Sequence, residues 1–268
     1  MTTYALANAS PHGNPHLNGL SGMFDPFTAA RISESTRLAG ARCLELGAGN
    51  GSIAVWLAEE VGPDGHVTAT DLDVRHIPEH DRVSVVSHDL TRDPVPDGPF
   101  DLIHARLLLG HLTNRNALLS ELTARLAPGG TVLIEDFNTT GAGRSTAVLH
   151  APSQPPGVAD LWNQYEALRH ELFAASGTDG SFIIQVHGLL VDAGLADVQT
   201  VTYCQSWRGG DPGSRHALGT LQQFRPRLAG RGFGDDAVDI LVDALDDPDF
   251  HVAGRLLCST SGSAPSAA

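Results

Sequence analysis

The sequence predicts an α/β fold in which a mainly parallel sheet carries helices on both faces. Between about residues 40 and 140, short apolar runs alternate with longer runs whose apolar residues have helical spacing. A glycine-rich turn joins the first apolar run to the first helical run, and an acidic residue ends the next apolar run. Strands and helices that alternate in this way are typical of parallel sheets covered on both faces.

The individual elements follow from local patterns, with glycine and proline marking the turns between them. Residues 23–38 have helix-like spacing after Pro26. The runs expected to form strands are 42–47, 66–71, 82–89, 100–105, 131–137, 198–210 and 251–260. The runs expected to form helices are 51–61, 114–126, 158–175, 181–194, 214–229 and 234–246.

Composition predicts one globular domain over residues 23–258, with loose ends. Residues 1–22 are rich in Asn, Gly, Pro and His and are expected to form a flexible arm, and the small, polar residues 259–268 a disordered tail. No run has the pattern of a secretory signal or the length of a membrane span, so we expect a cytoplasmic protein without a membrane partner.

Charge and cysteine content exclude several classes of chemistry. The net charge is −14, which disfavours nucleic acid as a partner. All 17 basic residues are arginines, so a P-loop lysine, a Schiff-base lysine and a lysine general base are excluded. The three cysteines form no C-x-x-C pair, and we expect no metal site or disulfide framework. The expected partner is a small-molecule substrate, and a homodimer is left open.

The glycine turn reads G-x-G-x-G at Gly47, Gly49 and Gly51, with Ser52 where a dinucleotide fingerprint has its third glycine. Glu45 ends the preceding strand, two residues before the first glycine. A carboxylate there would repel a pyrophosphate and favour an ammonium or sulfonium group. The turn therefore favours a ligand with a cationic arm over NAD.

Two further carboxylates end the next strands. Asp71 lies where it can accept hydrogen bonds from both ribose hydroxyls, and Asp89 where it can accept from the amine of adenine. The ligand implied is a nucleoside with a cationic arm and no pyrophosphate, and S-adenosylmethionine fits this description. The plainer alternative is that the glycines only make a tight turn and that the acids are solvated strand ends.

The motifs together give the sequence a resemblance to a known family. "LELGAGNG", "ATDLD", "HDL" and "LAPGGTVLIED" occur in the order and spacing typical of class I S-adenosylmethionine-dependent methyltransferases, over roughly residues 40–140. "FDLIHARLLLGHL" resembles the small-molecule enzymes of actinobacterial type, many of which modify secondary metabolites. The resemblance implies a Rossmann-like, doubly wound, seven-stranded sheet with its last strand antiparallel.

The resemblance also implies a cofactor core over about 40–140 and a helical cover over the acceptor pocket, formed by about 141–195 together with 23–38. The cofactor would be S-adenosyl-L-methionine. The cofactor-binding residues implied are Glu45, Gly47, Ala48, Gly49, Gly51, Asp71, Leu72, Asp89, Leu90, His104, Ala105 and Arg106. The aromatic residues that could line the acceptor pocket, or form ordinary core, are Trp162, Tyr165, Phe173, Tyr203 and Trp207.

Methyl transfer requires close placement of the two reacting atoms and, for some acceptors, a base. His111 and Asp136 are the catalytic candidates, since they follow the fourth and fifth strands. The other candidate bases considered are His104, Glu135, His150, His170 and His187. We expect a methyltransferase acting on an aromatic or other secondary metabolite. The alternatives are a protein that binds the cofactor without transferring methyl, an NAD-dependent oxidoreductase, and an RNA or protein methyltransferase.

Overall fold

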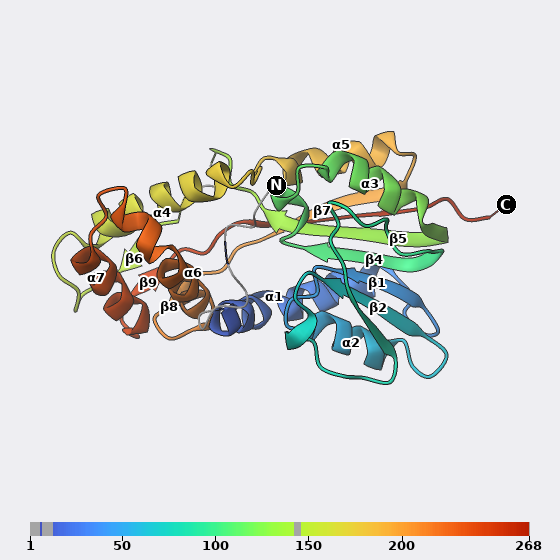
Figure 1. The fold of residues 1–268 in the computed structure, drawn as a ribbon, viewed down its shortest axis with the longest axis horizontal. Helices are drawn as coiled ribbons and strands as arrows, with labels where there is room; N and C mark the ends of the chain where they lie inside the picture. The colour runs from blue at the N-terminus through green and yellow to red at the C-terminus, as the bar shows by residue number, and fades with distance from the viewer. Residues whose placement is uncertain (1–5, 7–12, 142–145, 268) are drawn as a thin grey trace. The chain divides into compact units, whose positions relative to one another are not determined.

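The computed structural model describes residue 6, residues 13–141 and residues 146–267. The chain divides into two compact units, both drawn in Figure 1. The sheet unit comprises residues 25–138, 179–203 and 257–268. The helical unit comprises residues 1–24, 139–178 and 204–256.

A seven-stranded sheet organises the sheet unit, with the strand order β3-β2-β1-β4-β5-β10-β7. The first five strands of this order are mutually parallel, while β10 is antiparallel to both β5 and β7. The predicted sheet with an antiparallel last strand is therefore confirmed. Its strands are β1 (Arg42–Leu46), β2 (His66–Asp71), β3 (Val83–Ser87), β4 (Phe100–Arg106), β5 (Leu126–Phe137), β7 (Ala196–Tyr203) and β10 (Leu257–Ser263).

Helices cover both faces of this sheet (Figure 1). On one face α2 (Ser52–Glu60) packs with the second half of α1 (Gly13–Ser35), and their shared core includes Ile32, Leu57 and Leu133. The helices α3 (Arg115–Ala124) and α5 (Phe182–Asp192) pack on β5 from the other side. Two 3-10 turns, η1 (Val74–His76) and η2 (Leu109–His111), follow β2 and β4.

The second half of α1 is anchored to the sheet by a buried arginine. Arg31 is 4% exposed and donates hydrogen bonds to Ser259 Oγ (3.4 Å), Ser261 Oγ (3.2 Å) and Gln199 Oε1 (3.0 Å). These three acceptors lie on β10 and β7. A charged side chain buried at this position is stabilised because hydrogen-bond acceptors surround its planar group.

The beginning of α1 corrects the expected arm. Residues 13–22 are helical, and the rest of the expected arm apart from residue 6 lies outside the described residues. Pro15 lies in the first turn, where a proline costs the helix no internal hydrogen bond.

The helical unit has its own hydrophobic core. It contains α4 (Val158–Ala175), α6 (Pro212–Ala229) and α7 (Asp235–Asp246). A small antiparallel sheet joins β6 (Val148–His150), β9 (His251–Val252) and β8 (Trp207–Arg208). Trp162 and Tyr165 are fully buried in this core, with Phe173 and Trp207 packed against it. Tyr203 belongs instead to the sheet unit, where it stacks on Phe27 with 4.8 Å between ring centroids.

Three expected boundaries are wrong. Residues 259–263 belong to β10 rather than to a disordered tail. The expected strand 198–210 divides into β7 and β8, which lie in different sheets, and the expected strand 251–260 divides in the same way into β9 and β10. The connection from β7 to β8 passes close to the connection from β9 to β10. A Cβ on Gly254 would collide with the carbonyl oxygen of Gln205. An alternating sequence pattern does not show where a chain leaves one sheet for another.

The expected extent of the cover also needs correction. The segment 179–195, which includes α5, belongs to the sheet unit, whereas 204–256 belongs to the helical unit. Among the described residues, no helix combines the length and apolar character that crossing a membrane would require.

Candidate functional site

The glycine turn after β1 follows a path that side chains with a Cβ resist. Gly47, Gly49 and Gly51 have φ values of 64°, 59° and 78°, in the left-handed region. A Cβ on Gly51 would lie 2.8 Å from Ile77 Cγ2, and one on Gly47 would lie 3.1 Å from Leu108 Cδ1. Ala48 completes the turn, and its N–H donates to Thr70 O on β2 at 2.9 Å. The turn thus packs tightly against neighbouring side chains of the protein.

Asp71 at the end of β2 holds this turn in place. Its Oδ2 accepts a hydrogen bond from the Gly49 N–H at 2.8 Å, and its Oδ1 accepts from the Asp73 N–H at 3.0 Å. Burial raises the pKa of Asp71, and the backbone donors oppose that rise. Beside its backbone donors, which include the Leu72 N–H, the Asp71 carboxylate keeps acceptor capacity for a ligand, because a carboxylate has about four acceptor positions. The next residue, Leu72, is 65% exposed and presents apolar surface beside the carboxylate.

The end of β3 carries the third expected carboxylate. Asp89 Oδ1 accepts from the Thr91 N–H (3.0 Å) and hydroxyl (2.6 Å), and these bonds lower the pKa of Asp89. Leu90 is buried, and its carbonyl accepts a hydrogen bond from Asn114 Nδ2 at 2.8 Å. The carboxylates of Asp71 and Asp89 therefore both lie at the carboxyl ends of neighbouring strands, where ligands bind in sheets of this kind.

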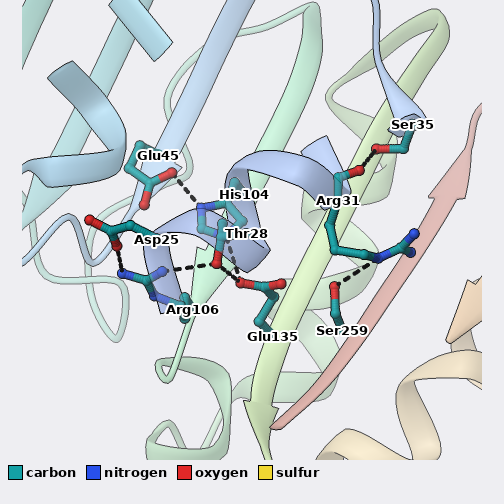
Figure 2. A network of polar contacts seen from close by, with 9 residues as sticks. All are labelled: Asp25, Thr28, Arg31, Ser35, Glu45, His104, Arg106, Glu135 and Ser259. Atoms are coloured by element: carbon teal, nitrogen blue, oxygen red, sulfur yellow. Dashed lines mark hydrogen bonds and ion pairs between the residues drawn. The ribbon is translucent and has the colours of Figure 1, made fainter. Parts of the chain in front are cut away.

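A buried charge network lies at the ends of β1, β4 and β5 (Figure 2). At its centre, His104 Nδ1 lies 2.6 Å from Glu45 Oε2, and His104 Nε2 lies 3.5 Å from Glu135 Oε2. All three side chains are almost completely buried. Ionised carboxylates only accept hydrogen bonds, so both ring nitrogens of His104 must carry protons to satisfy them.

The pKa shifts of His104 and Glu135 agree with a cationic His104. Burial alone would lower the pKa of His104, but the two carboxylates outweigh burial and raise it to about 9. Burial favours the neutral form of Glu135, but His104, Arg106 and Thr28 lower its pKa below the ordinary value. At neutral pH the centre of the network is therefore an imidazolium between two carboxylates.

The network continues to α1 through Arg106. Arg106 donates to Thr28 Oγ1 at 2.9 Å and to Asp25 Oδ1 at 2.7 Å, and the Thr28 hydroxyl donates to Glu135 Oε2 at 2.5 Å (Figure 2). Ala105, between the two basic residues, is fully buried. The structure thus directs His104 and Arg106 toward carboxylates and α1. The sequence analysis expected both residues to be among those that bind the cofactor.

The two catalytic candidates lie on the opposite face of the sheet. Successive strand residues face opposite sides, so Asp136 points away from Glu135. Asp136 Oδ2 accepts from the Gly110 N–H at 3.1 Å, and Oδ1 accepts from the Phe137 N–H at 2.8 Å. A Cβ on Gly110 would lie 2.8 Å from Asp136 Oδ2, so a larger residue at this position would require the carboxylate to shift.

Arg115 holds the segment that carries His111. Its guanidinium donates to Leu109 O at 3.4 Å and Gly110 O at 3.2 Å, and it pairs with Asp179 Oδ2 at 3.2 Å. Burial raises the pKa of Asp136 to about 6, and burial together with the Arg115 charge lowers the pKa of His111 to about 4. At neutral pH Asp136 is therefore mostly ionised and His111 is neutral.

The other candidate bases lie elsewhere. His187 on α5 is exposed and lies 3.0 Å from Thr200 Oγ1, whereas His150 and His170 belong to β6 and α4 of the helical unit. The sequence analysis missed the polar residues of α1, namely Asp25, Thr28 and Arg31. Their spacing of three places them on one helix face, which was the available signal.

The site at the carboxyl edge defines an α/β protein with a nucleoside-type binding turn, and comparison with known proteins gives its family. A methyltransferase-domain family model matches residues 27–233. The chain belongs to this family. Together with the sheet order, this match confirms the resemblance to class I S-adenosylmethionine-dependent methyltransferases, whose cofactor is S-adenosylmethionine.

Two curated relatives match part of the chain. Methyltransferase str3 of Strobilurus tenacellus is 35% identical over 100 residues, which are 36% of this chain and 35% of the relative. The ubiquinone/menaquinone biosynthesis C-methyltransferase of Cupriavidus metallidurans is 29% identical over 128 residues, 45% of this chain and 51% of the relative. The chain therefore spans between about a third and a half of these relatives.

Solved structures share the fold at low identity. Phosphoethanolamine N-methyltransferase 2 of Haemonchus contortus, solved in complex with S-adenosyl-L-methionine, has a TM-score of 0.52 at 18% identity. That match covers 90% of this chain and 53% of the other. A methyltransferase from Bacillus halodurans also has a TM-score of 0.52, at 17% identity, over 88% of this chain and 98% of its own.

Replacing the buried cation tests the charge network. His104→Gln leaves Glu45 and Glu135 without a cation between them, and we expect it to lower the free energy of unfolding by about 3–5 kcal/mol at neutral pH. Because the folded-state pKa of His104 is above its unfolded value, the wild-type advantage should be full below about pH 6.5. It should then fall as pH rises through about 9.

Urea unfolding of both proteins from pH 6 to pH 9.5 measures this difference. His187→Gln, which changes an exposed histidine with one hydroxyl contact, is the matched control and should show no such pH dependence. A His104→Gln difference that is constant across the range would contradict a cationic His104.

Proposed function

We propose that this chain transfers the methyl group of S-adenosylmethionine to a small-molecule acceptor. The observation that carries the proposal is the Asp71 carboxylate bonded to the Gly49 N–H. This bond fixes a left-handed glycine turn against a carboxylate that keeps acceptor positions for a ribose. Family membership supports the same reaction class.

The residues present fit the cofactor. The glycines at 47, 49 and 51 have no Cβ, so backbone can approach a ligand at the turn. Asp71 retains acceptor capacity for the ribose, and the exposed Leu72 offers an apolar contact for the adenine. When bound, S-adenosylmethionine supplies a methyl carbon activated by its sulfonium.

The remaining cofactor residues are assigned by their position. We assign Asp89 and Leu90 to the adenine side, because they follow β3 at the same sheet edge. We assign Glu45 to the cationic arm, since its carboxylate lies two residues before the turn and uses one oxygen for His104. His104, Ala105 and Arg106 then act at the methionine end chiefly by holding Glu45 and α1 in place.

We further propose that the acceptor is an aromatic or other secondary metabolite. The relative from Cupriavidus metallidurans acts in ubiquinone and menaquinone biosynthesis by its name, so a small-molecule acceptor occurs among similar proteins. The net charge of −14 disfavours the phosphate backbone of a nucleic acid.

Asp136 is the better candidate for a general base where the acceptor has a proton to lose. A base works best when its pKa is near the working pH, and the pKa of Asp136 is raised to about 6. The pKa of His111 is lowered to about 4, so it binds a proton less readily. The Gly110 and Phe137 N–H groups orient the Asp136 carboxylate.

The cofactor assignment is tested by calorimetric titration with S-adenosylhomocysteine. We expect wild type to bind it and Asp71→Ala to bind at least about 30-fold more weakly, because hydrogen bonds to a charged acceptor contribute about 1.5–3 kcal/mol each. Asp73→Asn removes the same charge two residues away, where the carboxylate pairs with Arg75, and should bind like wild type.

Wild-type protein that binds NAD and not S-adenosylhomocysteine would contradict the cofactor assignment. Formation of S-adenosylhomocysteine from S-adenosylmethionine in the presence of candidate phenolic and quinone-type acceptors then tests the transfer itself. Binding without turnover on any acceptor would favour a protein that only binds the cofactor.

The base assignment is tested with Asp136→Asn on an acceptor that carries an O–H group. We expect kcat to fall by about 10²- to 10⁴-fold, and wild-type kcat/KM to decrease below about pH 6 as Asp136 takes up a proton. Binding of S-adenosylhomocysteine should not change. Asp136→Asn with wild-type kcat would assign the proton to another group, and His111→Gln is the comparison variant.

A further inference from the structure

We propose that Thr28 of α1 is a positioning residue for the cofactor site, acting through Glu135 and His104 on Glu45. The inference rests on the proposed function, because it concerns the same cofactor turn. It adds a residue 19 positions before Gly47 in the sequence, on a helix outside the turn itself.

The direction of each hydrogen bond around Thr28 is fixed by its partners. A guanidinium only donates, so Thr28 Oγ1 accepts from Arg106 at 2.9 Å. The single hydroxyl proton must therefore go to Glu135 Oε2, at 2.5 Å. Thr28 is fully buried and thus joins a cation to a carboxylate with no water between them.

Thr28 supplies the closest donor to Glu135. The other donor to Glu135 Oε2 is His104 at 3.5 Å, and Glu135 Oε1 has no hydrogen-bond partner among the described residues. Without the Thr28 hydroxyl, Glu135 would keep only this long contact. A buried carboxylate that loses its donors is costly, so Glu135 would shift toward a new partner or take up a proton.

A change at Glu135 reaches the cofactor turn in two steps. His104 shares its charge between Glu135 and Glu45, which lies directly opposite it on the neighbouring strand. Glu45 is separated from Gly47 only by Leu46 at the end of β1. The hydroxyl of Thr28 is therefore linked to the position and charge of Glu45 by named side chains (Figure 2).

The test compares three variants by calorimetric titration with S-adenosylhomocysteine. Thr28→Val keeps the volume and removes the hydroxyl, and we expect about tenfold weaker binding, within the usual range of coupling between sites. Thr28→Ser keeps the hydroxyl and should stay within about threefold of wild type. A role in packing alone would give the reverse order.

Thr131→Val is the matched control. Thr131 is also buried, and its hydroxyl donates to Ser35 O at 3.1 Å, so it holds the same helix to the same sheet outside the charge network. It should bind within about threefold of wild type. Asp25→Asn is a second network variant that keeps the core intact, since Asp25 lies at the partly exposed end, and it should weaken binding by a smaller factor.

Equal losses in Thr28→Val and Thr131→Val would overturn the inference, because general loosening of α1 would explain both. Loss in Thr28→Ser as large as in Thr28→Val would also overturn it. Wild-type protein that does not bind S-adenosylhomocysteine would instead overturn the proposed function. Urea unfolding of each variant ensures that binding is compared between folded proteins.

Discussion

A buried imidazolium between two carboxylates connects the parts of the sheet unit on which the candidate site depends. His104 lies on β4, Glu45 lies near the end of β1, and Glu135 lies near the end of β5. Burying these three charges is unfavourable unless each one satisfies the others. The charge on His104 therefore fixes Glu45 beside the glycine turn and Glu135 beneath α1, in one arrangement.

The end of β5 separates two kinds of chemistry. Glu135 faces α1 and the charge network, whereas Asp136 faces the η2 segment and Arg115, because adjacent residues of a strand point to opposite sides. The pKa of Glu135 is lowered because cationic and hydroxyl donors surround its carboxylate. The pKa of Asp136 is raised because burial outweighs its backbone donors and the charge of Arg115. The proposed function therefore assigns a positioning role to Glu135 and proton transfer to Asp136.

The sequence predicted those features that local pattern determines. The alternation of strands and helices, the glycine turn and the acids at strand ends all depend on neighbouring residues. The family resemblance implied the seven-stranded sheet with an antiparallel last strand, and this sheet is confirmed. The sequence did not predict the charge network, because its hydrogen bonds join distant positions: Thr28 to Glu135 and Asp25 to Arg106. The sequence shows that 25, 28 and 31 share a helix face, but it does not show which strand ends that face meets.

The charge network at the sheet edge depends above all on the charge of His104. Nitrogen NMR of histidine-labelled protein at pH 7.5, with the His104 signals assigned by their loss in His104→Gln, measures it directly. We predict that both ring nitrogens of His104 are protonated and stay so until about pH 9. One unprotonated ring nitrogen at pH 7.5 would contradict the imidazolium, and with it the role of His104 in holding Glu45 and Glu135.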